Sequence, residues 1–328
     1  MKKSLPILCT SFLFCSVFSY GNEEVEEAQT DEIAMLEPSI FAQQPASLEE
    51  LDLSPSTFAP RHKNPFLAVG LSALVPGLGH IYLEEYKTAG YLLGSTGLFG
   101  GLSYSDVLNE NFQASNLITM QNVSLYGIYA AYRDVRSYNR EEGYFYKMPK
   151  DSFADLVWAP FQWSVLKKPE VWGGFLGALT LAAGAQYFLS PEKTECAANH
   201  SSKMTFPLLA FPVGIGEESF FRGYLQPMFS EWLTPWGGII LSSLAFGAAH
   251  LGNGLFMEPE QRARYYSVGL PVITSFGFYF GWLTYKNCSL KESVALHAWY
   301  DFALFLVSYA AVQSAAVGKP SFSISIPF

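Results

Sequence analysis

Charged side chains are scarce in this chain. Only 15% of its 328 residues are Asp, Glu, Lys or Arg, while half are hydrophobic and 16% are aromatic. Ordinary soluble domains carry about 25% charged residues. Basic residues are fewer than acidic ones, the net charge is −9, and the sequence lacks the basic footprint that is typical of nucleic-acid-binding proteins. The composition therefore indicates a membrane protein and argues against nucleic-acid binding.

The sequence also lacks the cysteine spacings of metal or redox sites and the alternating pattern of β-strands. The four cysteines, Cys9, Cys15, Cys196 and Cys288, have no metal-site or redox spacing, which argues against a disulfide scaffold. The apolar runs are long and lack the period-2 alternation of strands. Backbone groups in lipid must bond internally, which long helices achieve. The sequence thus predicts an all-α polytopic membrane protein, a multi-helix transmembrane bundle.

The N-terminus has the pattern of a secretory signal. Lys2 and Lys3 precede an apolar stretch from Ser4 to Phe18, and small residues follow at Ser19 and Gly21. We therefore predict a signal peptide at residues 1–21, with an uncleaved anchor helix as the alternative. Residues 22–64 are acidic and proline-containing, with too little hydrophobicity for a core, and are predicted to be a flexible exported segment.

An N-terminal transmembrane hairpin module is predicted at residues 65–132. Its apolar stretches are Phe66–Leu83 and Ala89–Tyr104, with a weaker third span at Asn116–Tyr132. The stretch from Pro76 to Tyr82, Pro-Gly-Leu-Gly-His-Ile-Tyr, resembles small two-helix membrane modules of bacterial proteins. Pro76 is expected to kink its helix, and His80 is interpreted as a structural residue that caps the helix or bonds across the hairpin.

The rest of the chain divides into a linker, a helical bundle and a tail. Residues 133–170 contain seven basic residues and several aromatics, which is typical of an interfacial linker at the cytoplasmic side. Residues 171–316 form the predicted bundle and 317–328 a tail. The predicted bundle helices are Val171–Leu189, Thr205–Phe229, Trp236–Phe256, Ser267–Lys286 and Ser289–Ala316. The expected location is the bacterial inner membrane, with several passes.

Three motifs place ionisable groups within these apolar helices. The first contains Glu217, Glu218 and Arg222, the second has His250 four residues after Phe246, and the third has Asp301 four residues after His297. Residues four apart share a helix face, so Glu218 can pair with Arg222, while Glu217 points about 100° away. Each motif alone is compatible with a structural pair. Three helices that each bring an acid or an imidazole indicate a shared site, because such groups in membranes are usually functional.

The order and spacing of the motifs resemble the signature of the CPBP family. That family comprises CAAX-type prenyl endopeptidases together with bacteriocin-processing and immunity proteins, and the resemblance covers roughly Val171 to Ala316. It implies a glutamate-dependent intramembrane endopeptidase that needs no cofactor or obligatory metal. The implied substrate is a peptide or membrane-anchored protein in contact with the lipid bilayer.

Residue roles follow from the resemblance. It implies that Glu217 deprotonates a water held by His250, that His297 and residue 301 stabilise the oxyanion, and that Glu218 and Arg222 position the first carboxylate. Many members have Asn at the position of Asp301, and an ionised Asp cannot donate a hydrogen bond, so Asp301 either is protonated or orients His297.

Other functions remain open at this point. A Glu, His, His set can also bind zinc, although the chain has no His-Glu-x-x-His motif. A non-catalytic scaffold or immunity protein of the same fold is a further alternative. A small-solute carrier is disfavoured because residues 65–170 do not repeat the motif region.

Overall fold

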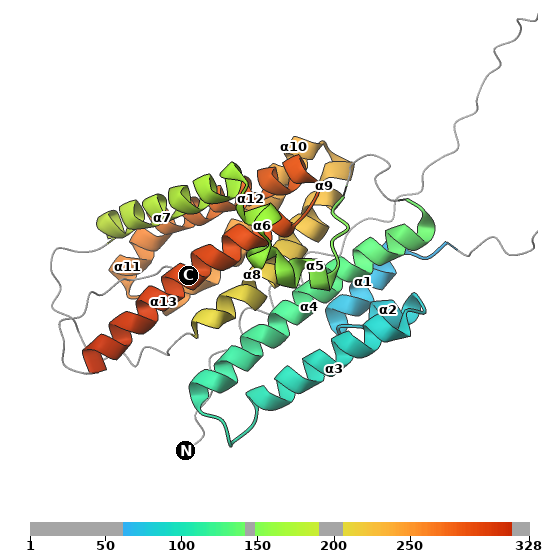
Figure 1. Cartoon of the computed structure of the whole chain (residues 1–328), viewed down its shortest axis with the longest axis horizontal. Coiled ribbons are helices and arrows are strands. Elements are labelled where there is room, and N and C mark those ends of the chain that lie inside the picture. The colour runs from blue at the N-terminus through green and yellow to red at the C-terminus, as the bar shows by residue number, and fades with distance from the viewer. Residues whose placement is uncertain (1–61, 142–147, 190–205, 317–328) are drawn as a thin grey trace, which may run out of the picture. The chain divides into compact units, whose positions relative to one another are not determined.

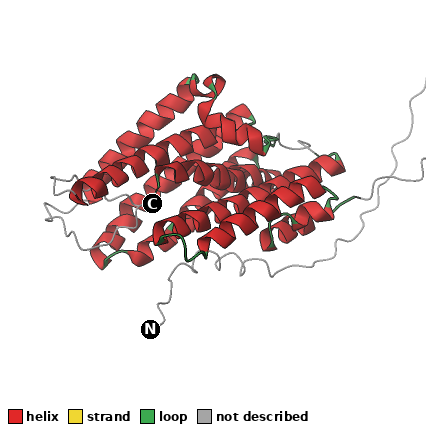
Figure 2. Ribbon diagram, turned by 60° about the horizontal axis from the view of Figure 1, so that its bottom comes forward, coloured by secondary structure: helices red, strands yellow, loops and turns green. Residues whose placement is uncertain are grey.

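The computed structural model describes residues 62–141, 148–189 and 206–316. The predicted signal peptide, nearly all of the acidic segment and the tail lie outside these residues. Within the described part every regular element is a helix and none is a strand (Figure 2), which confirms the predicted all-helical class.

The N-terminal module contains four helices where two or three were predicted, and its last helix continues past residue 132 into the predicted linker, as far as Asn139. They are α1 (Pro65–Leu74), α2 (Leu78–Tyr82), α3 (Tyr86–Ser103) and α4 (Glu110–Asn139). The predicted span Phe66–Leu83 is not one helix, because the chain breaks between α1 and α2. Gly77 has a positive φ of 99°, and a Cβ there would lie 2.8 Å from the carbonyl oxygen of Ala89. Pro76 therefore marks a break rather than a kink. Helix α4 packs against both α1 and α3.

The linker is more ordered than its mixed sequence suggests. It forms α5 (Phe153–Trp158), a short 3-10 turn (Ala159–Phe161) and α6 (Trp163–Leu166). A capping box between Ser152 and Asp155 starts α5. The hydrogen bond from the Ser152 hydroxyl, followed by the ion pair with Lys291, lowers the pKa of Asp155 to about 2. Trp158 and Trp163 are largely exposed, as expected for an interfacial segment.

The described second half is helical where the bundle helices were predicted, with two differences: the helix predicted at Trp236–Phe256 ends as an α-helix at Ala249, and the short helix Pro259–Arg264 was not predicted. Their observed bounds are α7 (Pro169–Leu189), a 3-10 turn (Pro207–Leu209), α8 (Ala210–Glu218), a π-helical stretch η3 (Ser219–Leu225), α9 (Gln226–Trp232), α10 (Pro235–Ala249), a 3-10 stretch (Leu251–Phe256), α11 (Pro259–Arg264), a π-helical stretch (Tyr265–Gly269), α12 (Leu270–Asn287) and α13 (Lys291–Ala316). Segments α8, η3 and α9 follow one another without a break.

Helix α8 lies at the centre of the packing. It contacts α4 of the N-terminal module on one side and α13 on the other (Figure 1). The stretch η3, which continues α8, contacts both α4 and α10. Two glycines permit the close approach to α4. A Cβ at Gly216 would lie 2.3 Å from Asn122 Oδ1, and a Cβ at Gly223 would lie 2.4 Å from the Tyr129 ring. The small residues fix the position of the motif-bearing segment against α4.

Helix length and composition support membrane crossing at one place. Among the described residues, Pro235–Leu255 is the helical segment that is both long and apolar enough to span a bilayer. The predicted multi-pass topology is therefore not confirmed by this criterion. Large hydrophobic side chains are nevertheless exposed on several helices, among them Leu74, Tyr91, Leu176, Leu244 and Leu306.

Candidate active site

The three sequence motifs meet in the interior of the bundle. Glu217 and Glu218 end α8, Arg222 lies in η3, His250 follows α10, and His297 and Asp301 lie on α13. Helices α8 and α13 contact each other, and α10 contacts η3. Residues separated by up to about 80 positions thus form one cluster, as the motif pattern predicted.

Glu218 is the fixed centre of this cluster. Its side chain is fully buried, and its Oε1 accepts hydrogen bonds from Arg222 Nη1 at 3.0 Å and from His297 Nδ1 at 2.8 Å. Charge-assisted hydrogen bonds of this kind are the strong ones in proteins. Glu218 therefore ties η3 to α13, and its geometry leaves it unsuited to approach a substrate.

Arg222 is held through both terminal nitrogens of its guanidinium. It is fully buried, its Nη2 donates to the carbonyl oxygen of Gly277 at 3.1 Å, and its guanidinium lies 4.3 Å from the centre of the Phe246 ring. A guanidinium above an aromatic face gains a cation–π attraction, which strengthens when both are desolvated. The π-helical geometry of η3 surrounds this residue, and π-bulges are frequent at functional sites. Phe246, four positions before His250, thus serves as an aromatic partner of the Arg222 guanidinium.

Glu217 has a different environment from its neighbour. Its side chain is 23% exposed, and its Oε2 lies 3.9 Å from His297 Nε2. Within the described residues it makes no hydrogen bond. The imidazoles of His250 and His297 are both close enough to act on its carboxylate electrostatically. The two adjacent glutamates therefore differ as the helix geometry predicted, with one locked and one accessible.

His250 has a defined tautomer. The backbone N–H of His250 bonds to the Gly247 carbonyl at 3.0 Å, which leaves the Phe246 carbonyl at the helix end available. That oxygen accepts a hydrogen bond from His250 Nδ1 at 2.8 Å. Since Nδ1 carries the proton, Nε2 of a neutral ring is an acceptor. Tyr265 donates its hydroxyl to the His250 carbonyl at 2.8 Å and fixes this turn.

His297 lies among three carboxylates. Besides its bond to Glu218, its Nε2 lies 3.4 Å from Asp301 Oδ2, one helical turn away. The ring of Phe280 stacks on the imidazole with a centroid separation of 5.0 Å and an interplanar angle of 13°. Asp301 and His297 are both almost completely buried. This arrangement fits Asp301 as a residue that orients His297.

Sequence reasoning missed the contribution of α12 to the site. Gly277 supplies the carbonyl that Arg222 bonds, and Phe280 supplies the ring under His297. Neither residue is ionisable, so a search for charges in apolar stretches passes over them. The i, i+3 spacing of a glycine and an aromatic is the one local signal, and it is common in packed membrane helices.

A possible metal-binding group lies outside the three motifs. Among the described residues, one potential ligand atom from each of His80, Glu85 and Asp134 lies within 4.8 Å of the other two. Glu217, His250 and His297 do not form such a group.

The comparison with protein families agrees with the motifs. Residues 200–303, about a third of the chain, match the family model described as type II CAAX prenyl endopeptidase Rce1-like. This confirms the family resemblance over the segment that carries all three motifs, and it supports a hydrolase of the protease class. No curated protein and no solved structure matches the chain.

Proposed function

We propose that this chain is a membrane-embedded endopeptidase in which Glu217 activates the attacking water. The observation that carries the proposal is the contrast between the two adjacent carboxylates. Glu218 is buried and bonded to Arg222 and His297, whereas Glu217 is 23% exposed and makes no hydrogen bond within the described residues. A general base must reach both water and substrate, and the partial exposure of Glu217 supports this role. The match of residues 200–303 to an endopeptidase family supports the same reaction class.

The proposed reaction starts with proton transfer from water to Glu217. The accepting Nε2 of His250 holds the second hydrogen of that water, and the water oxygen forms a bond to the scissile carbonyl carbon. The carbonyl oxygen becomes an oxyanion that accepts a hydrogen bond from His297 Nε2–H. The protonated Glu217 then gives its proton to the leaving amine as the C–N bond breaks. One donor to such an oxyanion is typically worth about 3–4 kcal/mol.

The other three polar groups act as positioning residues in this scheme. Glu218 accepts the Nδ1–H of His297 and so directs Nε2 toward the reacting carbonyl. Arg222 balances the charge of Glu218 in the buried interior. Asp301, at 3.4 Å from His297 Nε2, stabilises the protonated imidazole. Preorganised charges of this kind are effective because they need no rearrangement during the reaction.

The proposed location in a bilayer is supported by the surface of the bundle. Large apolar side chains are exposed along α7, α10 and α13, for example at Leu176, Leu244 and Leu306. Large exposed apolar surfaces mark interaction or membrane-facing sides of a protein. We propose several passes in the bacterial inner membrane, and substrates that are peptides or protein segments anchored at the membrane.

The decisive experiment compares wild type with Glu217→Gln. Both proteins, in detergent or liposomes with chelator present, are incubated with a diverse peptide library, and new peptide ends are identified by mass spectrometry. We expect the substitution to reduce cleavage by about 10²–10⁴-fold, the usual contribution of a general base. Glu260→Gln is the matched control, because the Glu260 side chain is 74% exposed and its ion pair among the described residues is with Arg264 on its own helix.

Each result bears on a specific alternative. Unchanged cleavage in Glu217→Gln refutes the proposed base. A folded wild-type protein that cleaves no peptide or membrane-anchored protein favours the scaffold or immunity alternative. Activity that disappears with chelator and returns with added zinc, in the wild type and in Glu85→Gln alike, favours a metal-dependent protease at the motifs.

The role proposed for Asp301 has its own test. Asp301→Asn keeps an oxygen that can accept from His297 but removes the charge. We expect peptidase activity within about tenfold of wild type and an altered pH profile, because a positioning residue changes the protonation of its partner. A loss of activity well beyond tenfold, with an unchanged pH profile of the residual rate, contradicts this role.

A further inference from the structure

Three potential metal ligands converge in the N-terminal module, away from the three motifs. His80 lies on α2, Glu85 immediately precedes α3, and Asp134 lies on α4. One ligand atom from each residue lies within 4.8 Å of the other two. Because a central ion binds nitrogen and oxygen ligands at about 2.0–2.2 Å, ligand atoms around one ion lie up to about 4 Å apart. A small inward adjustment of the side chains is sufficient.

The backbone that carries these residues is tightly fixed. Gly79, next to His80, packs so closely on α1 that a Cβ would lie 2.2 Å from the Ala68 carbonyl oxygen. The backbone N–H of Glu85 bonds to the His80 carbonyl at 2.8 Å and closes the turn between α2 and α3. Helix α4 packs against α1 and α3. The three ligands are thus presented by a rigid frame.

His80 is the independent indication that a ligand belongs here. Its side chain is fully buried, and within the described residues neither ring nitrogen makes a hydrogen bond of normal geometry. Its Nε2 nevertheless lies 3.3 Å from Asp134 Oδ2. A buried polar atom without a hydrogen bond costs about 1–3 kcal/mol. A cation bound between Nε2 and the Asp134 carboxylate gives both of these ligand atoms a partner.

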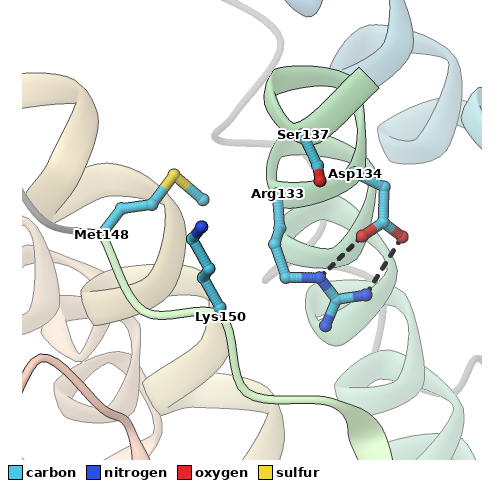
Figure 3. Close-up of a pocket in the computed structure, with 5 residues that line it drawn as sticks. All are labelled: Arg133, Asp134, Ser137, Met148 and Lys150. Atoms are coloured by element: carbon cyan, nitrogen blue, oxygen red, sulfur yellow. Dashed lines mark hydrogen bonds and ion pairs between the residues drawn. The ribbon is translucent and has the colours of Figure 1, made fainter. Parts of the chain in front are cut away.

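Asp134 is held in place from its other side. Arg133 donates to it as a fork, with Nε–Oδ1 at 2.7 Å and Nη2–Oδ2 at 3.0 Å (Figure 3). Metal-ligating carboxylates are commonly oriented by such outer hydrogen bonds. A cavity of about 210 Å³ adjoins this pair, and its lining includes Ser137 and Lys150. Glu85 is exposed, so an ion can enter from solvent.

We propose that His80, Glu85 and Asp134 bind a divalent transition-metal ion of the zinc type. Imidazole favours zinc, iron, nickel and copper, while carboxylates alone favour magnesium, calcium and manganese. One nitrogen and two oxygen ligands suit zinc, with water completing the tetrahedron. The ion cross-links the turn between α2 and α3 to α4, and α4 packs directly on α8 and η3. Its role is structural, and it is independent of the peptidase proposal.

The test measures zinc binding to the full-length protein, purified without a histidine tag and freed of metal by chelator. Titration calorimetry with Zn²⁺ and elemental analysis after dialysis are expected to give one ion per chain. His80→Gln and Glu85→Gln are each expected to weaken binding by at least about 10–100-fold, the range that loss of an outer-shell partner already produces. Glu85→Gln is the safer variant for folding, because Glu85 is exposed.

Glu84→Gln provides the matched control. Glu84 precedes Glu85 in the same turn, is 70% exposed and pairs with Lys63 instead, so its substitution is expected to leave zinc binding unchanged. His250→Gln in parallel separates this site from the motif cluster. One ion that is lost in Glu85→Gln and retained in Glu84→Gln and His250→Gln supports the site.

Three outcomes overturn the proposal. The first is no zinc binding by folded wild type, which leaves a simple His80–Asp134 ion pair. The second is equal weakening by Glu84→Gln and Glu85→Gln. The third is loss of the ion in His250→Gln alone, which assigns it to the motif cluster.

Discussion

Replacing Arg222 by Met tests how the buried polar cluster is held together. The guanidinium is fully buried, bonds Glu218 at 3.0 Å and lies 4.3 Å from the centre of the Phe246 ring. Methionine keeps much of the volume and the ring contact but removes the charge. Glu218 is then a buried carboxylate whose remaining hydrogen bond is the one from His297.

The expected cost follows from this geometry. Two unit charges at 3.0 Å in an effective dielectric of about 20 attract by about 5 kcal/mol. Removing one partner of a buried pair typically destabilises a protein by about 3–5 kcal/mol. For a folded unit of this size each kcal/mol lowers Tm by about 2–4 °C. We therefore expect Arg222→Met to lower Tm by about 6–20 °C and to abolish peptidase activity.

The assay is thermal unfolding in one fixed detergent, with denaturant unfolding as a second measure. The double variant Glu218→Gln/Arg222→Met is expected to be more stable than Arg222→Met alone, because no buried charge then lacks its partner. Arg264→Met is the matched control. It removes the arginine from another i, i+4 pair, whose glutamate, Glu260, is 74% exposed. Loss of that pair is expected to cost less than about 1 kcal/mol.

The reasoning is refuted if Arg222→Met and Arg264→Met destabilise the protein equally. That result means that the Glu218–Arg222 pair is solvated. It is also refuted if the double variant is as unstable as the sum of the two single variants, because then the two charges do not interact.

Two further predictions concern packing and pH. Gly216→Ala is expected to lower the free energy of unfolding by about 1–3 kcal/mol through overpacking, since its Cβ would lie 2.7 Å from the Asn122 Cα. Gly97→Ala is the control, because a Cβ at this position on α3 meets open space. It is expected to be neutral or slightly stabilising in the same unfolding assay. The Ser152 hydroxyl and a lysine of α13 hold the pKa of Asp155 at about 2, below its ordinary value of 3.8. The stabilisation by the ionised Asp155 is present above pH 4 and is lost as pH falls toward 2. The difference in unfolding free energy between wild type and Asp155→Asn is therefore expected to shrink over that range. A difference that stays constant contradicts this prediction.

The sequence predicted the second half of the fold well because its helices are long apolar runs. The predicted helix Val171–Leu189 differs from the observed α7 by two residues at one end. The N-terminal module was predicted less well. Its first span breaks at Gly77 because the turn packs against the Ala89 carbonyl, and this tertiary contact leaves only the Pro-Gly pair as a local signal.

The candidate site, too, was predicted in part from the sequence. The i, i+4 spacing predicted the pairing of Glu218 with Arg222, because it depends on one helix alone. The hydrogen bond from His297 to Glu218 joins residues 79 positions apart, and no spacing rule reaches that far. The same limit applies to His80, which sequence reasoning treated as a structural residue. Asp134 is brought to it by the packing of α4, and its position in the sequence gives no sign of the contact.

The two adjacent glutamates illustrate why one motif serves two tasks. A step of one residue turns the side chain by about 100° around the helix. One direction leads into η3, where Arg222 and the aromatic rings exclude water, and the carboxylate there is fixed by two short hydrogen bonds. The other direction leads to the partly exposed space near His250 and His297. A single carboxylate cannot be both rigidly bonded and free to accept a proton from water. In the mechanism that we propose, the consecutive pair separates these requirements: the buried glutamate fixes His297, and the accessible glutamate accepts the proton.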